Sequence, residues 1–261
     1  MALAGCEASH PPEENQAEPG NNVAAPSPVT VPSPEQPLDR ERLLLAVAQA
    51  RSAHAAGADD RAAQAELDGG RFELRLRFGC GAPAGAAAGN PSVRHDAAAR
   101  TVELSASANL DLSDPLVAAA AGQGIEAVDG IWLARPWLLQ AACPPAALLS
   151  PETPAAEAPA QPPREIGIAQ FFTPDDSRVG RRGDRSYRHV VRFEEGQDPA
   201  RPQGYDLVLS GRLRAGPAGR VIRCAAPDPS TRPACLISAE FEEVRMEDAE
   251  RREVLARWRR G

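Results

Sequence analysis

The sequence contains no lysine: all 29 basic side chains are arginines, against 36 acidic ones. Ala, Gly and Pro are abundant, so we attribute this bias to codon composition and draw no functional conclusion from it. Aromatic residues make up only 4% of the 261 residues, whereas 26 residues are prolines, so part of the chain is expected not to pack. No apolar run reaches the roughly 18 residues that a membrane-spanning helix needs. The net charge of −7 disfavours a nucleic-acid partner.

The first 37 residues differ in composition from the rest of the chain. They hold five acidic and no basic side chains, and the stretch from 7 to 37 contains eight prolines and no periodic apolar pattern. Such a segment cannot bury enough surface to offset the entropy lost on ordering. We therefore expect residues 1–37 to form a disordered, acidic, Pro-rich tether.

Near the start of this tether, the tetrapeptide Leu3-Ala4-Gly5-Cys6 resembles the lipobox of bacterial lipoproteins. The resemblance implies that a signal peptidase cleaves before Cys6 and that this cysteine then carries lipid. The lipid would anchor the protein to a membrane of the bacterial cell envelope, facing the periplasm. Only five residues precede Cys6, fewer than a signal peptide requires. A lipoprotein would therefore need Met1 to be an internal start, and the alternative is a chance match.

Cysteine parity is consistent with an oxidising compartment. Without Cys6, four cysteines remain, namely Cys80, Cys143, Cys224 and Cys235, an even set suited to two disulfides. Of the three pairings that four cysteines allow, we favour Cys80 with Cys143 and the last two together, because each pair then lies within one predicted domain. Four reduced thiols in a cytosolic protein are the alternative. Zinc is less favoured, since no C-x-x-C pair or His-containing pair has the spacing of a finger.

Hydrophobic patterning predicts an α+β protein with two domains. Residues 38–150 mix helical and strand patterns, whereas residues 166–261 show short strand patterns between Gly, Pro and Asp turns. The second unit is therefore predicted to be an antiparallel all-β domain, like a sandwich or a barrel. Residues 151–165 are rich in Pro and Ala and are interpreted as a linker; a long surface loop within one domain is the alternative. The five strands expected in the second domain cover residues 187–193, 205–213, 220–224, 235–244 and 254–258.

The clearest local signals lie in the mixed α/β domain. Asp39 is a candidate helix N-cap, and apolar residues at helical spacing follow it as far as Gly57, where a helix is expected to end. Residues 71–78 alternate between apolar and charged side chains, which predicts a half-buried strand. A hairpin is expected over 93–106, and a further short helix over 113–121.

No enzyme signature is present. The sequence lacks the G-x-S-x-G, Walker A and H-E-x-x-H motifs and has no convincing dinucleotide-binding glycine motif, so we assign no catalytic residue, metal ligand or cofactor. His95 lies beside Asp96 in a predicted hairpin, and His189 shares a strand face with apolar residues. Both histidines are interpreted as structural rather than catalytic. A hydrolase without a recognisable motif stays as an alternative.

The densest charged segment covers residues 175–188. Guanidinium groups can bind phosphate or carboxylate in a bidentate manner, so an anionic component of the envelope fits this segment as a ligand. The alternative is a solvated loop that neutralises itself through its own aspartates. The candidate ligand-binding residues are Arg178, Arg181, Arg182, Arg185 and Arg188.

These observations predict a lipid-anchored cell-envelope protein that acts by binding or scaffolding rather than by catalysis. The first alternative is a periplasmic module that binds an anionic ligand through the arginines of residues 178–188. The expected partners are a membrane, through the N-terminal lipid, and an envelope glycolipid or protein. No nucleic acid is expected as a partner.

Overall fold

Three helices and ten strands make up the described part of the chain in a computed structural model, which confirms the predicted α+β class. The helices are α1 (Arg40–Ala56), α2 (Arg61–Leu67) and α3 (Pro115–Ala121). The strands are β1 (Arg71–Phe78), β2 (Ser92–Asp96), β3 (Thr101–Ala106), β4 (Ala127–Trp132), β5 (Ile166–Phe172), β6 (Tyr187–Arg192), β7 (Tyr205–Leu213), β8 (Ile222–Ala225), β9 (Ala234–Asp248) and β10 (Val254–Arg259). The described residues are 36–80, 90–133, 138, 140–143, 164–176, 181–183, 185–194 and 203–259, so nearly all of the predicted tether lies outside them.

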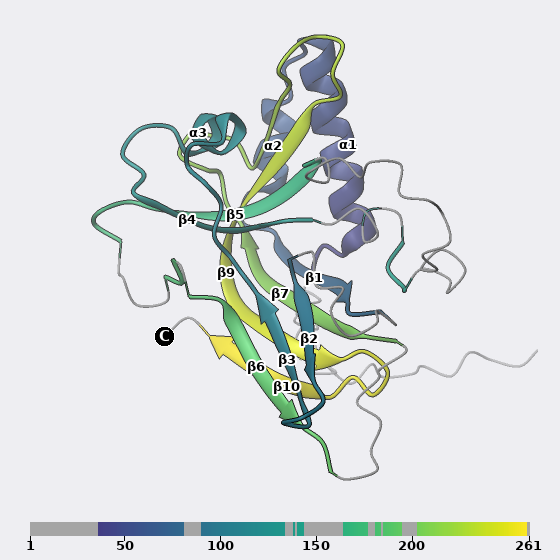
Figure 1. Cartoon of the computed structure of the whole chain (residues 1–261). Helices are drawn as coiled ribbons and strands as arrows, with labels where there is room; N and C mark the ends of the chain where they lie inside the picture. Colours follow the sequence, from purple (N-terminus) through teal and green to yellow (C-terminus); the bar gives the residue numbers. More distant parts are fainter. Residues whose placement is uncertain are drawn as a thin grey trace, which may run out of the picture. The chain divides into compact units, whose positions relative to one another are not determined.

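The long strand β9 organises the larger of two sheets (Figure 1). This sheet has seven strands: β1, β7, β9, β5 and β4 follow one another in that order, and β8 and β10 also pair with β9. β5 runs parallel to β9, whereas β7, β8 and β10 run antiparallel to it. The large sheet is therefore mixed, and the prediction of a purely antiparallel unit is corrected.

The two predicted domains contribute strands to the same sheet. β1, from residues 38–150, pairs along its whole length with β7, from residues 166–261. β4 and β5, which flank the predicted linker, also pair with each other. Residues 35–261 form one compact unit. The segment 151–165, most of which lies outside the described residues, does not divide the sheet, so the predicted division into two domains is corrected.

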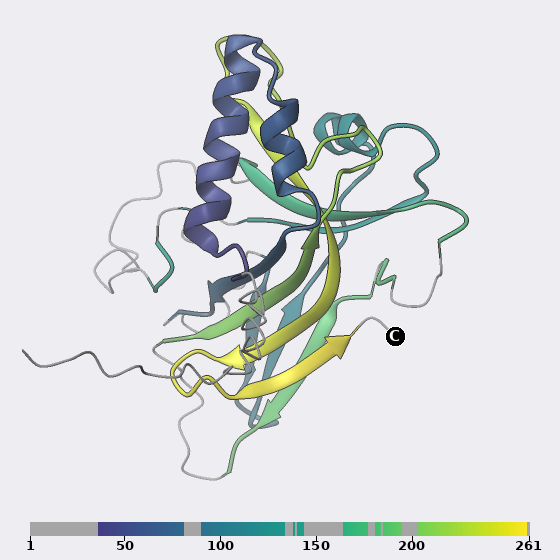
Figure 2. The same ribbon diagram turned by 180° about the vertical axis from the view of Figure 1, so that it is seen from behind.

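Helix α1 begins and ends where the sequence predicts. The side chain of Asp39 accepts a hydrogen bond of 3.0 Å from the backbone amide of Arg42, and Gly57 ends the helix in the left-handed conformation, with φ of 62°. Leu43 and Val47, on the buried side of α1, belong to the main hydrophobic core, and α1 packs against β8, β9 and β1. Figure 2 shows α1 and α2 side by side against the large sheet. Burial of this apolar side of α1 fixes the helix on the sheet.

The smaller sheet contains β2, β3 and β6 in that order, and its first two strands form the predicted hairpin. Val102 and Leu104 on β3 are fully buried and join the same core as Leu207 and Met246 of the large sheet. The small sheet therefore packs one face onto the large sheet.

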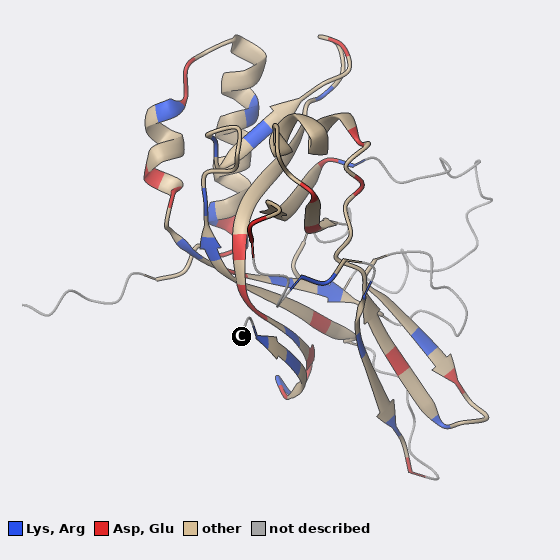
Figure 3. Cartoon of the chain, turned by 90° about the vertical axis from the view of Figure 1, so that its left-hand side faces the viewer, with Lys and Arg blue, Asp and Glu red and all other residues tan. Residues whose placement is uncertain are grey.

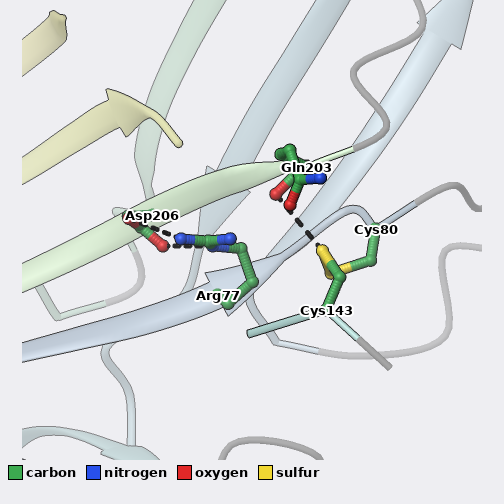
Figure 4. Close-up of a disulfide and its surroundings, with 5 residues drawn as sticks. All are labelled: Arg77, Cys80, Cys143, Gln203 and Asp206. Carbon is green, nitrogen blue, oxygen red and sulfur yellow. Dashed lines mark hydrogen bonds and ion pairs between the residues drawn. A yellow bond between two sulfur atoms is a disulfide. The ribbon is translucent and has the colours of Figure 1, made fainter. Parts of the chain in front are cut away.

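Both favoured disulfides are present. Cys80 and Cys143 are joined with their Cα atoms 5.5 Å apart, which ties the end of β1 to the chain at Cys143 (Figure 4). Cys224 and Cys235 lie directly opposite each other on β8 and β9 and form the second disulfide. The cysteine pairing inferred from the sequence is confirmed.

A buried ion pair lies beside the first disulfide. Arg77 on β1 and Asp206 on β7 occupy paired positions, and the guanidinium donates two hydrogen bonds, of 2.6 and 3.2 Å, to the two carboxylate oxygens (Figure 4). The Asp206 side chain is only 2% exposed. Two parallel hydrogen bonds compensate this buried charge and fix the register of β1 against β7.

A cluster of charged side chains, the Glu–Arg cluster, spans β1 and β9. Arg245 donates to Glu73 (3.2 Å), Glu243 (2.6 Å) and Glu247 (2.8 Å). Arg75 donates to Glu73 (3.0 Å) and Glu247 (2.5 Å). Burial by itself raises the pKa of Glu247, but hydrogen bonds from Arg75 and Arg245 outweigh it, so the pKa lies below its ordinary value. Figure 3 shows that acidic and basic residues are interspersed over the strands, an arrangement that allows such cross-strand pairs.

Candidate functional site

β9 exchanges one partner strand for another along the same edge, which leaves a gap in the large sheet. β5 pairs with β9 only as far as Ser238, and β10 pairs only from Glu243 onward, while β8 and β7 occupy the opposite edge. Inside the gap, the backbone amide of Phe241 donates to the side-chain oxygen of Gln170, on β5, at 2.9 Å. The Gln170 side chain thus satisfies the backbone amide of Phe241, which pairs with neither β5 nor β10.

A cavity of about 390 Å³ lies at this gap. Residues of β4, β5, β9 and β10 line it together with Tyr187 of β6 and with three arginines, Arg181, Arg182 and Arg185. These arginines belong to the arginine-rich segment, which comprises the described residues 181–183 and 185. Its volume falls in the range of small-molecule sites, about 300–1,000 Å³. Five arginines and three carboxylates give the lining a formal net charge of +2. These charged residues are Arg181, Arg182, Arg185, Arg257, Arg259, Asp129, Glu242 and Glu243.

Asp129 on β4 fixes the backbone of the arginine-rich segment. The residue is 3% exposed, and its two carboxylate oxygens accept hydrogen bonds from the backbone amides of Arg182, at 2.7 Å, and Gly183, at 3.1 Å. Burial raises the pKa of Asp129 above its ordinary value, against the opposing effects of these two hydrogen bonds and of the charges on Arg182 and Arg181. The arginine-rich segment is therefore held against β4 by a buried carboxylate.

Arg181 fastens the same segment to the ends of β4 and β5. Its guanidinium group forms an ion pair with Glu126, donates to the carbonyl oxygen of Thr173 at 2.6 Å and lies 5.1 Å from the centre of the Phe172 ring. Its buried Nε atom has no hydrogen-bond partner among the described residues. Arg181 is therefore largely structural, with one remaining donor that a bound anion or water would satisfy.

The guanidinium groups of Arg182 and Arg185 are held by backbone carbonyl groups. Arg182 donates to the carbonyl oxygens of Arg185 (3.2 Å) and Ser186 (2.8 Å) and lies over the ring of Tyr187, with Cζ 4.4 Å from the ring centre. Arg185 donates to the carbonyl oxygens of Arg181 (2.5 Å) and Arg182 (3.4 Å). A carbonyl group orients a guanidinium without neutralising it, so two oriented cations border the cavity.

The β9 and β10 side of the cavity carries a second set of charges and an aromatic pair. Glu243 accepts a hydrogen bond of 2.6 Å from Nε of Arg259 and lies 3.5 Å from Nε of Arg257. Trp258 packs edge-to-face against Tyr187, with ring centres 5.1 Å apart. Burial raises the pKa of Tyr187 to about 12, so its phenol stays protonated at neutral pH and remains a hydrogen-bond donor.

The structure brings three of the five predicted arginines together at the cavity. Arg188 follows Tyr187 on β6 and therefore faces the opposite side of the strand, where it forms an ion pair of 2.6 Å with Glu103. The prediction that Arg188 shares a site with the other arginines is corrected. Arg178 and the lipobox cysteine, Cys6, lie outside the described residues.

Sequence reasoning missed the residues that the large sheet brings to the cavity. A carboxylate at Asp129, inside an otherwise apolar strand, is a signal that could have indicated a buried polar site. Arg257 and Arg259 alternate with Trp258, a pattern that does not differ from that of a solvated strand face. Gln170 gave no signal, because its role depends on the gap between β5 and β10.

The two histidines considered in the sequence lie apart from each other. His95 on β2 and His189 on β6 are on strands that flank β3 from opposite sides, and burial lowers the pKa of His189. Within the described ranges, no group of His, Cys, Asp and Glu side chains could hold a metal ion. No described helix has both the length and the apolar character needed to cross a membrane.

Similarity to known proteins gives no indication of function. The chain matches no family model, no curated protein and no solved structure. Function has to be inferred from the chemistry of the cavity.

Proposed function

We propose that this chain is an extracytoplasmic binding protein whose cavity holds a small anionic ligand. The observation that carries the proposal is the pair Arg182 and Arg185, whose guanidinium groups border the cavity and are oriented by backbone carbonyl groups. Oriented guanidinium groups bind phosphate and carboxylate through charge-assisted hydrogen bonds, which are roughly twice as strong as neutral ones. Because both groups are already fixed, little conformational entropy is lost on binding.

The remaining lining of the cavity supports the same class of ligand. The net charge of +2 complements a phosphate or carboxylate group. The rings of Phe172, Tyr187 and Trp258 add apolar surface that suits an organic part of the ligand. A small organic phosphate or carboxylate therefore fits better than a neutral or cationic compound.

A location in the cell envelope, with lipid at Cys6, is the second part of the proposal. The two disulfides support it, because disulfides persist in oxidising compartments and are rare in the cytosol. In that setting the two sheets serve as a sandwich-like scaffold at the end of the acidic tether, and an envelope glycolipid headgroup is a source of the ligand. We assign no catalytic step to the protein.

Replacing Arg182 or Arg185 by glutamine is expected to weaken the binding of inorganic phosphate by at least about tenfold, or about 1.4 kcal/mol. Each substitution removes a cation from the cavity wall. Titration calorimetry on the full chain, with circular dichroism to verify the fold, measures the change. Arg188→Gln is the matched control, because Arg188 lies on the other face of β6. The affinity of this variant for phosphate should equal that of the wild type. Wild-type affinity in both cavity variants would contradict the proposal.

Mass spectrometry of the natural product tests the anchor. Cys6 is expected to be the first residue of the mature protein and to carry lipid, and Cys6→Ser should move the protein from the membrane fraction to the soluble fraction. The Cys6 substitution leaves both disulfides intact, so its effect reports on the anchor alone. A mature protein that retains an unmodified Cys6 would disprove this part of the proposal.

A further inference from the structure

Asp129 places a buried carboxylate in the wall of a cavity that is otherwise suited to anions. We propose that Asp129 makes the cavity selective for oxyanions that carry a proton, namely hydrogen phosphate and the singly ionised form of phosphomonoesters, over proton-free oxyanions such as sulfate. This inference rests on the proposed function and deepens it, since it names the class of ligand.

The hydrogen bonds of Asp129 show why a proton is needed. An ionised carboxylate only accepts hydrogen bonds, and each of its oxygens has about two acceptor sites. The backbone amides of Arg182 and Gly183 occupy one site on each oxygen. An O–H group of the ligand can donate to a remaining site, whereas a proton-free oxygen would face the carboxylate as a second anion.

The surroundings of Asp129 make this difference large. Asp129 is only 3% exposed, so little water screens the repulsion between its carboxylate and a proton-free anion. The carboxylate cannot turn away, because both oxygens are held by the arginine-rich segment. The backbone of β4 is also fixed here, since Asp129 forms a bridge with Asn109 and the amide of Gly130 donates to the carbonyl oxygen of Ala108 at 2.7 Å. A rigid acceptor of this kind rejects a ligand that lacks the matching donor.

The same geometry predicts a dependence on pH. Burial raises the pKa of Asp129, so the carboxylate takes up a proton on acidification. The protonated carboxyl group can then donate a hydrogen bond to sulfate. Tyr187, whose pKa is raised to about 12 by burial, stays neutral across the acidic and neutral range. The charged and titratable groups that line the cavity with Asp129 are Arg181, Arg182 and Arg185 before β6, Tyr187 on β6, Glu242 and Glu243 on β9, and Arg257 and Arg259 on β10.

Titration calorimetry of the full chain at about pH 7.5 with inorganic phosphate and with sulfate tests the inference. Both ionised forms of phosphate present at this pH carry a proton, and sulfate carries none. Phosphate is expected to bind at least about tenfold more tightly than sulfate. In Asp129→Asn the ratio should fall to about threefold or less, because the side-chain amide can donate to sulfate. Asp175→Asn makes the same change at an exposed position and should keep the wild-type ratio.

Two further arms identify the source of the phosphomonoester. Glycerol 3-phosphate represents a soluble ligand, and vesicles of phosphatidylcholine with phosphatidic acid represent a lipid headgroup; both are measured together with sulfate at about pH 6, where roughly half of a phosphomonoester carries the proton. Tighter binding of glycerol 3-phosphate than of the vesicles assigns a soluble ligand, and the reverse order assigns a lipid. Either order supports the ligand class, provided that sulfate binds more weakly than both.

A series of titrations on the wild type keeps the inference testable if Asp129→Asn does not fold. The affinity for sulfate should rise as the pH falls from about 7.5 to about 5, with proton uptake detected by comparing buffers of different ionisation enthalpy. Equal affinities for phosphate and sulfate at about pH 7.5, or a sulfate affinity that does not change with pH, overturn the inference and leave the proposed function standing. Absence of binding by all the anions overturns the proposed function itself.

Discussion

Replacing both Cys80 and Cys143 by alanine is expected to lower the free energy of unfolding by about 4 kcal/mol. The disulfide joins residues that are 63 positions apart in the sequence and closes a loop that contains β2, β3, α3 and β4. A cross-link over such a span restricts the unfolded chain strongly, because the entropy that it removes grows with the logarithm of the loop length. Urea titration of the full chain under non-reducing conditions, followed by circular dichroism, measures the change.

The second disulfide is the matched control for this experiment. Cys224 and Cys235 are only 11 positions apart, so replacing both by alanine should cost about 3 kcal/mol by the same entropic argument. A reducing agent should bring the wild type close to a variant that lacks both bridges. A larger loss for the short bridge than for the long one, or no effect of reduction, would show that loop closure does not set the contribution of these bridges.

Replacing Arg245 by methionine is expected to cost about 3–5 kcal/mol of unfolding free energy. Arg245 contacts all three glutamates of the Glu–Arg cluster, and the Glu247 side chain beside it is 5% exposed. Methionine fills much of the volume but leaves buried negative charges with fewer partners. Thermal and urea unfolding of the full chain at about pH 7 measure the loss.

The pH dependence of the loss in Arg245→Met tests independently whether the ionised glutamates cause it. In the wild type, the pKa of Glu247 lies below its ordinary value, so the stabilisation is present at neutral pH and is lost as the pH falls through that lowered pKa. The difference in unfolding free energy between wild type and variant should therefore shrink in acid.

Arg214→Met is the control for burial. It removes an exposed pair with Glu240 and should cost less than about 1 kcal/mol. An equal loss in the two variants would refute the importance of burial in the cluster.

Elements whose signals are local were predicted well from the sequence. The two ends of α1 could be predicted from Asp39 and Gly57, because each residue acts within one turn of the helix. The alternation over residues 71–78 identified β1, since one face of that strand is buried and the other is partly exposed. Both disulfides were inferred from parity and from a division into two domains; the pairing is confirmed, although the division is not.

Elements that depend on distant partners were missed. β5 was not among the predicted strands, because nearly all of its residues are buried and its apolar run therefore shows no alternation. The single large sheet was also missed, since β1 and β7 are separated by more than 120 residues and no local pattern indicates that they pair. The proline-rich segment between β4 and β5 suggested a boundary that the sheet does not have.

The candidate site shows the same limit. The sequence identified the arginine-rich segment, but it could not separate Arg182, which borders the cavity, from Arg188, which pairs with Glu103. That separation depends on which face of β6 each residue occupies. Asp129 and Arg259 reach the cavity only because β4 and β10 lie on either side of the gap in the sheet. Their role is set by tertiary structure and not by the residues around them in the chain.

β9 follows five other strands of the large sheet in the sequence, so these strands are synthesised before the sheet can be completed. β5, β7 and β8 all pair with β9, so they lack their shared partner until residues 234–248 have left the ribosome. Until then the nascent polypeptide would expose apolar strands and would depend on chaperones to avoid aggregation.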